Sequence, residues 1–348
     1  MGAQATLILR ERARMARAWT RARRLSGADR AWPAACMTRH VMRLLHHFAR
    51  VEGVRLHWAE LGESTARPPL VLLHGLHDYY RTWGQLAPRL ANDRRVLMPD
   101  LPGHGLSGRP DASYRLDWYA DIMARWLEMV LDTGGVVDVV GHSFGGGVAQ
   151  MMLLHCPKRI RRLVLVSSGG LGREIAWCLR LASIPFVVEH LGQPFMRLGT
   201  RIAIKATGDV VSREDSARLA AMNAQRGSAR AFARTVQDII DWRGQRRCFF
   251  ERADELSKLP PIAAFWGDRD TVIPYSHAEA LAEAVDGVRI TRFKDCGHYP
   301  HHESPDAFVA ALRGFLDSRE ARAACLHGRA REGRPRVLAR HLATAAGV

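Results

Sequence analysis

The sequence lacks any C-x-x-C pair, and its six cysteines are scattered along 348 residues. A zinc ribbon or a thioredoxin-like redox motif is therefore not expected, and the scattered cysteines favour a reducing, cytoplasmic location. No stretch approaches the roughly 18 uninterrupted apolar residues of a membrane-spanning helix. H-E-x-x-H, G-x-G-x-x-G after a strand and G-x-x-x-x-G-K-[ST] are also missing, so we expect neither a metal site nor a cofactor.

Acidic side chains are scarce at both ends of the chain. Residues 1–50 hold eleven arginines and two acids, and residues 319–348 hold seven arginines and two acids. The segment between them carries a net charge of only +2, against +16 for the whole chain. A near-neutral body argues against specific nucleic-acid binding, which requires a basic surface on the folded part.

The two basic ends are expected to lie outside the folded body. We expect 1–49 to be a disordered or dispensable extension, with a translation start at Met37 or Met42 as one explanation for it. An organelle transit peptide or a basic arm are the alternatives, because the segment is rich in arginine and lacks the apolar core of a secretory signal. We expect the same dispensable status for the basic tail, 318–348.

Between the ends, short apolar runs alternate with helix-like amphipathic segments. The strand-like runs are Leu70–Leu73, Arg95–Met98, Val136–Val140, Leu163–Val166, Ile262–Trp266 and Val288–Phe293. The helical patterns are Thr82–Ala91, Leu116–Leu131, Gly146–His155, Ser276–Val285 and Pro305–Phe315. This alternation predicts an α/β fold with a mostly parallel sheet and helices on both faces. Val51–Leu61 alternates like an edge hairpin.

One segment interrupts this alternation. From Gly169 to Leu256 the sequence shows only helical patterns rich in arginine, alanine and leucine, and no strand-like run. Because it lies between two predicted strands, it predicts a helical subdomain, 169–256, inserted into a core made of 50–168 and 257–317.

The most informative motif is G-x-S-x-G around Ser143. It follows a predicted strand and precedes a predicted helix, and the glycines at 141 and 145 suit a turn without space for side chains. Such a turn exposes the Ser143 hydroxyl at a helix N-terminus, where an oxyanion is stabilised. Ser143 is the candidate nucleophile, and an ordinary glycine-rich turn is the alternative.

A nucleophilic serine needs a base and a carboxylate that orients the base. His298, in a loop after the last predicted strand, is the candidate base, whereas His301 and His302 lead into the final helix and are expected to be solvated. Asp268 and Asp270 both follow a strand. We favour Asp270 because it immediately precedes an apolar turn that would hold its backbone.

The oxyanion hole needs two backbone N–H donors. The first candidate is Phe144, which follows the nucleophile. The second is Leu76, because the small Gly75 allows its N–H to turn inward. His74 and His142 adjoin these residues and are expected to pack and hydrogen-bond beneath the site.

These motifs together resemble the α/β-hydrolase superfamily. The resemblance rests on the order Ser143, Asp270, His298, with HGL at 74–76, DLPGHGLSG at 100–108 and GHSFGG at 141–146. It covers about residues 50–317 and implies an eight-stranded sheet with a helical lid inserted after the sixth strand. It also implies catalytic roles for the three residues. Lidded bacterial esterases and carbon–carbon-bond hydrolases are the most similar members.

The resemblance implies a serine hydrolase that cleaves a small to medium apolar ester, or a related acyl substrate, through an acyl-enzyme at Ser143. A carbon–carbon-bond hydrolase is one alternative, although the sequence has Tyr299 in place of tryptophan and lacks a Gly-Pro-Gly oxyanion turn. A ligand receptor on the same scaffold is another, and a nucleic-acid or membrane-surface protein acting through the tails is a third. Four lid arginines would suit a carboxylate substrate if they faced the pocket: Arg173, Arg180, Arg197 and Arg201.

Overall fold

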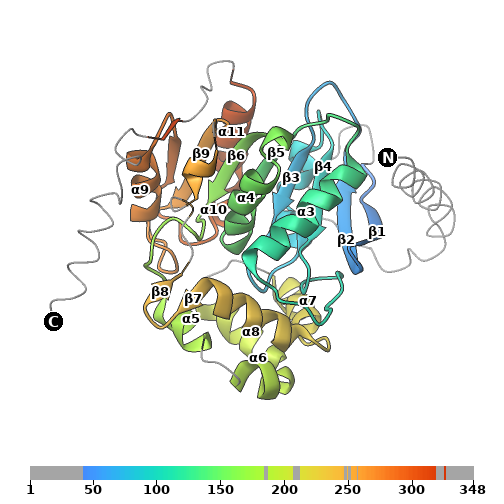
Figure 1. The fold of residues 1–348 in the computed structure, drawn as a ribbon, viewed down its shortest axis with the longest axis vertical. Helices are drawn as coiled ribbons and strands as arrows, with labels where there is room; N and C mark the ends of the chain where they lie inside the picture. Colours follow the sequence, from blue (N-terminus) through green and yellow to red (C-terminus); the bar gives the residue numbers. More distant parts are fainter. Residues whose placement is uncertain are drawn as a thin grey trace.

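An eight-stranded sheet forms the centre of the molecule (Figure 1). The computed structural model describes residues 42–183, 187–206, 212–246, 249, 252–256, 258–318 and 325–326. The strands, in their spatial order, are β1 (Leu45–Val51), β2 (Val54–Leu61), β4 (Val96–Asp100), β3 (Leu70–Leu73), β5 (Val137–His142), β6 (Ile160–Val166), β9 (Ile262–Gly267) and β11 (Arg289–Phe293). β2 pairs antiparallel with β1 and β4, and the other neighbours are parallel. The predicted fold class is confirmed.

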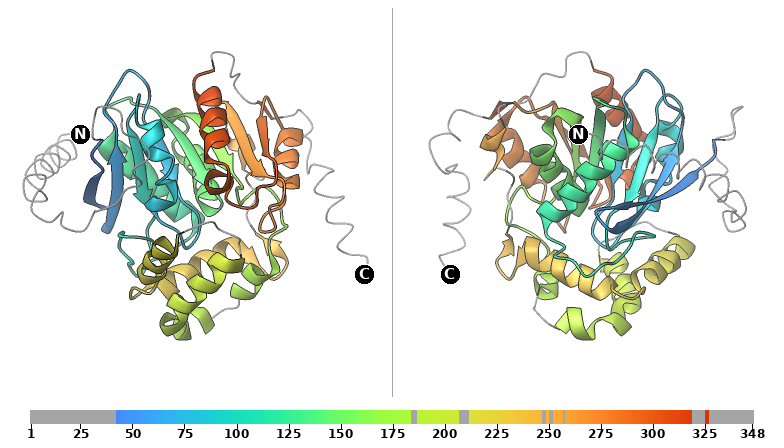
Figure 2. Two further views of the ribbon diagram at one scale, coloured as in Figure 1. Left: turned by 180° about the vertical axis from the view of Figure 1, so that it is seen from behind. Right: turned by 45° about the vertical axis from the view of Figure 1, so that its right-hand side comes forward.

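Helices cover both faces of this sheet (Figure 1 and Figure 2). α3 (Leu116–Val130), α4 (Phe144–His155) and α9 (Ser276–Ala284) contribute to one apolar core, and η1 (Tyr80–Trp83), α2 (Ala87–Leu90) and α11 (Pro305–Leu316) contribute to the other. The turn η2 (Pro157–Arg159) connects α4 to β6. On β3, Val71 and Leu73 join the first core, whereas Leu70 and Leu72 join the second. Burial on both faces explains why the central strands are continuously apolar in sequence.

A group of helices, which we call the lid, occupies the chain between β6 and β9. Its described elements are α5 (Trp177–Ala182), η3 (Val187–Leu191), η4 (Gln193–Phe195), α6 (Met196–Ala206), α7 (Arg213–Asn223), α8 (Ser228–Ile239) and η6 (Ala253–Glu255). The helices α5 to α8 gather at one end of the sheet (Figure 1 and Figure 2). The chain enters the lid from the carboxyl end of β6, so the lid lies at the edge where parallel strands place their loops.

The Arg109 side chain joins the lid to the loop after β4. Within that loop, its guanidinium donates to the carbonyls of Ser107 (2.9 Å) and Gly105 (3.1 Å). On the lid, it donates to Ser228 Oγ (2.8 Å) and to the Met222 carbonyl (3.0 Å). Because one rigid guanidinium bonds to both parts, α7 and α8 are held against the core.

Two expected boundaries in the core are wrong. β1 begins at Leu45, so the sheet starts before residue 49, the expected end of the extension. Its half-buried histidines, His46 and His47, hid the strand pattern. The helix expected at Thr82–Ala91 is divided into η1 and α2, because Pro88 has no N–H to donate to the carbonyl four residues earlier and its ring clashes with that carbonyl.

Two short pairings also depart from the expectation. The lid contains a hairpin of β7 (Ile240–Asp241) and β8 (Gly244–Gln245), too short to give a periodic signal. In the basic tail, β12 (Cys325–Leu326) pairs antiparallel with β10 (Val285–Asp286), so part of the tail is attached to the body. Residues 1–41 and 327–348, where the extension and the rest of the tail were expected, lie outside the described residues.

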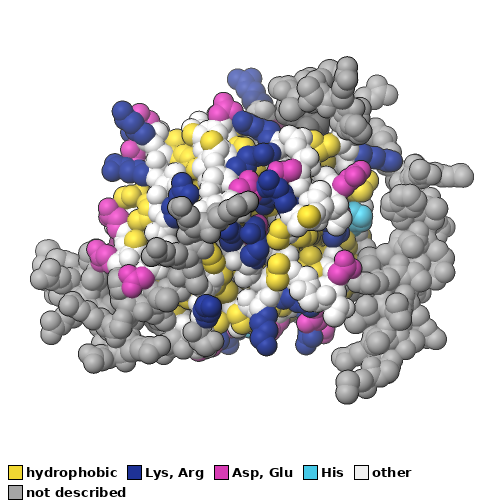
Figure 3. All heavy atoms as spheres, turned by 90° about the horizontal axis from the view of Figure 1, so that it is seen from above, with side chains coloured by type: hydrophobic (Ala, Val, Ile, Leu, Met, Phe, Trp, Pro, Cys, Tyr) yellow, Lys and Arg dark blue, Asp and Glu magenta, His cyan; other side chains and the backbone are white. Residues whose placement is uncertain are grey.

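Charges of both signs share the end of the molecule opposite the lid. Figure 3 shows lysine and arginine side chains with aspartate and glutamate among them on this face. The mixture agrees with the near-neutral charge of the central segment. Of the helices that the structure describes, none is long and apolar enough to cross a membrane.

Removal of residues 1–41 should leave the fold and the expected hydrolase activity unchanged, because the sheet begins at Leu45. We expect the thermal midpoint of unfolding to move by less than about 2 °C. In a domain of this size, a change of about 0.5 kcal/mol in the free energy of unfolding produces such a shift. Circular dichroism melting and an esterase assay measure this. An insoluble or inactive product would show that the segment contributes to the structure.

Candidate active site

Ser143 lies in a strained turn between β5 and α4. Its backbone has φ 51° and ψ −117°, a conformation that side-chain-bearing residues rarely adopt. A Cβ on Gly141 would lie 2.4 Å from the Gly145 carbonyl oxygen, and one on Gly145 would lie 2.4 Å from the His74 carbonyl oxygen. Neither position has space for a side chain, which explains the glycines of G-x-S-x-G. The strain persists because the surrounding backbone is so closely packed.

His298 and Asp270 form a buried hydrogen-bonded pair. His298 Nδ1 donates to Asp270 Oδ2 at 2.9 Å, and the two side chains are 4% and 0% exposed. The other carboxylate oxygen of Asp270 accepts from the N–H groups of Val272 and Ile273, both at 2.9 Å. The carboxylate is therefore fixed, and it keeps the proton on Nδ1, so that Nε2 of His298 is a free proton acceptor.

Asp268 lies in a different environment. Its Oδ2 is 3.5 Å from Arg292 Nη2, so this carboxylate forms an ion pair near the protein surface. Asp270, rather than Asp268, is the acid that contacts His298.

His142 connects the serine turn to the histidine loop. Its Nε2–H donates to the backbone carbonyl of His298 at 2.9 Å, and the centroids of the two rings are 4.9 Å apart. Burial, with the neighbouring His298 ring as a smaller cause, holds the pKa of His142 well below its usual value. A neutral His142 therefore fixes the His298 backbone next to Ser143 without adding a positive charge.

His301 and His302 do not reach this pair. Both bond to Thr82, His301 through Thr82 Oγ1 at 3.3 Å and His302 through the Thr82 carbonyl at 2.8 Å. The expectation that both are solvated is wrong for His301, which is fully buried on α10 (Pro300–Glu303) and stacks on Trp83. No sequence period distinguishes such a residue, because α10 is only four residues long.

The His74 ring fixes the peptide that would supply the second oxyanion donor. The Leu101 N–H donates to His74 Nε2 at 3.0 Å, so the proton of this ring is on Nδ1, which donates to the Gly75 carbonyl at 2.8 Å. In a trans peptide the carbonyl and the next N–H point in opposite directions. The Leu76 N–H therefore points away from His74.

Ser143 lies close to that peptide. A Cβ on Gly75 would be 3.4 Å from Ser143 Cβ. Phe144 is the first residue of α4, so its N–H has no acceptor within the helix. Leu76 follows Gly75 in this neighbouring loop and Phe144 follows Ser143 in the chain, so both remain the candidate oxyanion donors.

Asp100, in the DLPGHG segment, organises the loop beneath the site. It is fully buried, and its carboxylate accepts from His57 Nδ1 (2.7 Å), the Tyr80 N–H (2.7 Å) and the Leu106 N–H (2.8 Å). Gly105 has φ +48°, and a Cβ there would lie 2.3 Å from this carboxylate. Asp100 is therefore a structural residue of the turn. The contribution of His57 was not visible in the sequence, because it comes from β2.

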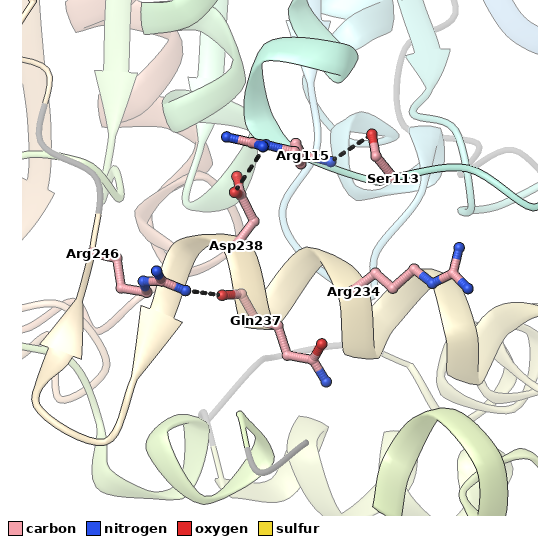
Figure 4. A pocket seen from close by; sticks show the side chains of 6 residues that line it. All are labelled: Ser113, Arg115, Arg234, Gln237, Asp238 and Arg246. Atoms are coloured by element: carbon pink, nitrogen blue, oxygen red, sulfur yellow. Dashed lines mark hydrogen bonds and ion pairs between the residues drawn. The ribbon is translucent and has the colours of Figure 1, made fainter. Parts of the chain in front are cut away.

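An open depression of about 300 Å³ lies between the lid and the core, away from the residues above. Its lining, drawn in Figure 4, comprises Ser113, Arg115, Arg234, Gln237, Asp238 and Arg246. Arg115 pairs with Asp238, and Arg246 donates to the Gln237 carbonyl. We therefore interpret these side chains as structural contacts rather than as a second site. Among the described residues, no group of three histidine, cysteine or acidic side chains could hold a metal ion.

The chain belongs to the α/β hydrolase fold family, whose sequence model matches residues 68–305. It is therefore a hydrolase of this fold.

Relatives carry several names. The chain is 34% identical to the uncharacterized protein Rv2715 of Mycobacterium tuberculosis (strain ATCC 25618 / H37Rv) over 283 residues, 78% of this chain and 81% of that protein. It is 30% identical to a pimeloyl-[acyl-carrier protein] methyl ester esterase of Aromatoleum aromaticum (strain DSM 19018 / LMG 30748 / EbN1), covering 69% and 94%. It is 29% identical to a 2-hydroxymuconate semialdehyde hydrolase of Pseudomonas sp. (strain CF600), covering 78% and 93%.

Asp270→Asn should lower kcat by about 10³–10⁴-fold, because an amide in place of the carboxylate favours the wrong tautomer of His298. Asp268→Asn is the matched control and should change kcat little, because Asp268 pairs with Arg292. Steady-state kinetics on a short p-nitrophenyl ester measure both. The opposite ranking would contradict the assignment of the acid.

His74→Ala should lower kcat by about 10–100-fold with little change in KM, because it frees the Gly75–Leu76 peptide without deleting its N–H. Deleting an oxyanion donor outright costs about 10²–10³-fold. His277→Ala is the control: it removes an imidazole that is also buried but bonds Glu174 at the edge of the lid. If both variants lost stability and neither lost kcat, His74 would have no part in positioning the donor.

Proposed function

We propose that the chain is a serine hydrolase that cleaves a small to medium apolar ester, or a related acyl substrate, through a covalent acyl-enzyme at Ser143. The observation that supports this most is the buried Asp270–His298 pair, whose free Nε2 belongs to a loop bonded to the serine turn through His142. A nucleophile, a base and an orienting acid are the parts that acyl transfer requires.

In the first half-reaction, His298 Nε2 accepts the hydroxyl proton of Ser143 while the serine oxygen attacks the substrate carbonyl. The carbonyl oxygen becomes an oxyanion between the N–H groups of Leu76 and Phe144. The N-terminus of α4 adds a favourable dipole at the same place. His298 then gives its proton to the leaving alcohol, and the acyl group remains on Ser143.

In the second half-reaction, His298 accepts a proton from a water molecule that attacks the acyl ester. The tetrahedral oxyanion forms at the same two donors, and its collapse releases the carboxylic acid and returns the proton to Ser143. Throughout, Asp270 stabilises the imidazolium and keeps its orientation. Its two backbone donors, Val272 and Ile273, prevent it from turning away.

A serine at this turn favours carbonyl substrates over epoxides or haloalkanes. Relatives of this scaffold that open epoxides or displace halides resemble the chain in fold but have aspartate as nucleophile, which forms a cleavable alkyl ester. Attack by Ser143 on an alkyl carbon would leave an ether, which water activated by His298 does not cleave. The acyl ester formed from a carbonyl substrate is cleaved readily.

Apolar groups near the entry to the lid favour an apolar acyl chain. Leu76 and Ile175 are half-buried against the core, and Phe144 is 5% exposed. The Ala176 N–H donates to the Val272 carbonyl at 2.9 Å, which holds the start of the lid against the loop that carries Asp270. A covered, apolar site suits small and medium substrates better than polymers.

A carbon–carbon-bond hydrolase is the second candidate, favoured by the relative named as a 2-hydroxymuconate semialdehyde hydrolase. The same three residues would serve that reaction. An assay with 2-hydroxymuconate semialdehyde beside p-nitrophenyl butyrate distinguishes the two. A kcat/KM much higher on the semialdehyde would replace the ester proposal.

A fluorophosphonate probe should label Ser143 covalently, and Ser143→Ala should lose both the labelling and the short-chain esterase activity, because the variant lacks the attacking oxygen. Peptide mass spectrometry locates the label. A wild-type protein that resists the probe yet hydrolyses styrene oxide would contradict the acyl-enzyme. One that resists the probe, turns over nothing and binds a small ligand tightly would be a receptor.

A further inference from the structure

Large apolar side chains are exposed mainly on the lid. The described residues include eight, and seven of them belong to the lid: Trp177, Leu181, Leu191, Phe195, Leu198, Ile202 and Trp242. Their exposed fractions run from 54% for Leu181 to 74% for Trp242. The eighth, Phe48 on β1, lies beneath the Arg55 guanidinium. Exposed large apolar side chains that gather on one subdomain, rather than being scattered singly over the surface, indicate an interaction site.

Four of the seven lie on the layer of the lid that is farther from the sheet. α8 contacts both α3 of the core and the turns η3 and η4, so it separates those turns from the sheet. α6 packs on α7 and lies at the far end of the lid from the sheet (Figure 1 and Figure 2). Leu191, Phe195, Leu198 and Ile202 belong to this η3–η4–α6 segment, and Trp177 begins α5. We call η3, η4 and α6 the outer layer.

The α6 helix has a buried side and an apolar exposed side. Met196 and Thr200 are 5% and 1% exposed, and they alternate with Leu198 and Ile202, which are 57% and 58% exposed. Residues four apart share a face of a helix, so Leu198 and Ile202 point the same way. Burying α6 on the lid therefore leaves a second apolar face in water.

Basic side chains lie beside that apolar face. Arg197, Arg201 and Lys205 are exposed and follow the same four-residue spacing, and α6 contains no acidic residue. None of the three forms an ion pair with another described residue. At 100° per residue, Lys205 lies within about 20° of Leu198 around the helix axis. A side chain of this kind can cover apolar surface with its stem and extend its charge past it.

We propose that the outer layer of the lid binds the surface of an anionic lipid bilayer. An exposed helix with an apolar stripe beside a basic stripe lies in the plane of the membrane interface, with the apolar side chains among the acyl chains and the cations at the headgroups.

A second copy of the chain fits this surface less well. A two-fold contact places the same patch of both copies face to face, so Arg197, Arg201 and Lys205 would meet their own equivalents without an acid on α6 to pair with. An anionic bilayer satisfies the apolar and the basic stripes together. The inference does not depend on the proposed reaction, because none of its residues belongs to the candidate active site.

The test is co-sedimentation of the full chain with large vesicles of phosphatidylcholine alone or mixed with phosphatidylglycerol. We expect binding to the mixed vesicles that falls as salt increases, and weak binding to phosphatidylcholine. Leu198→Ser with Ile202→Ser should lower the partition coefficient at least about tenfold. Arg197→Gln with Arg201→Gln should lower it by about tenfold or more at low salt.

Matched controls exclude general effects of charge and apolarity. Lys158→Gln with Arg289→Gln removes two exposed charges from the core, and Phe48→Ser removes an exposed aromatic ring from β1. Both should bind like the wild type. Thermal melts confirm that the lid variants are folded, as exposed positions predict.

Three results would overturn the proposal. The first is no binding to mixed vesicles at low salt. The second is binding that the lid substitutions leave unchanged, which the basic tails alone would produce. The third is a dimer in light scattering that Leu198→Ser with Ile202→Ser dissociates, which would assign the surface to a second copy.

Discussion

The backbone turn at Ser143 is the constraint on which the rest of the site depends. Close backbone contacts maintain its positive φ. A Cβ on Gly141 would collide with the Gly145 carbonyl, and a Cβ on Gly145 would collide with the carbonyls at the end of β3. This packing joins the ends of β3 and β5 and the start of α4 into one rigid corner. The same backbone contacts therefore position the candidate nucleophile and the two candidate oxyanion donors.

Imidazole rings extend this rigidity to the neighbouring loops. His74 and His142 each use one ring nitrogen on a backbone carbonyl, at Gly75 and at His298. Burial lowers the pKa of both rings, so that these contacts involve neutral side chains. His142 thus fixes the loop of the candidate base to the serine turn, and His74 fixes the Gly75–Leu76 peptide within its own loop. Neither ring adds a charge that would compete with an imidazolium at His298.

Much of the fold and the candidate site could be predicted from the sequence, because both depend on local patterns. The central strands are apolar throughout since both faces are buried, and G-x-S-x-G follows from steric contacts within a few residues. The predictions were wrong where contacts between residues far apart in the sequence determine the structure. β1 was hidden by its histidines, and His301 is buried by Trp83 and Thr82.

The lid separates two physical tasks between its layers. On its inner side, Arg109 holds α7 and α8 to the loop after β4. The Ala176–Val272 hydrogen bond attaches the start of the lid to the loop that carries Asp270. On its outer side, α6 exposes apolar and basic stripes that no part of the described core uses. The candidate active site is therefore held by the inner side of the lid, while the outer layer remains exposed for the proposed binding to a bilayer.

The central claim is that hydrolysis passes through an acyl group on Ser143. Rapid mixing of the enzyme with p-nitrophenyl butyrate, followed by acid quenching and mass spectrometry, tests it most directly. We expect a burst of p-nitrophenol no larger than the enzyme concentration, with one butyryl group on the peptide that contains Ser143. A butyryl group on another residue, or turnover that persists undiminished in Ser143→Ala, would contradict it.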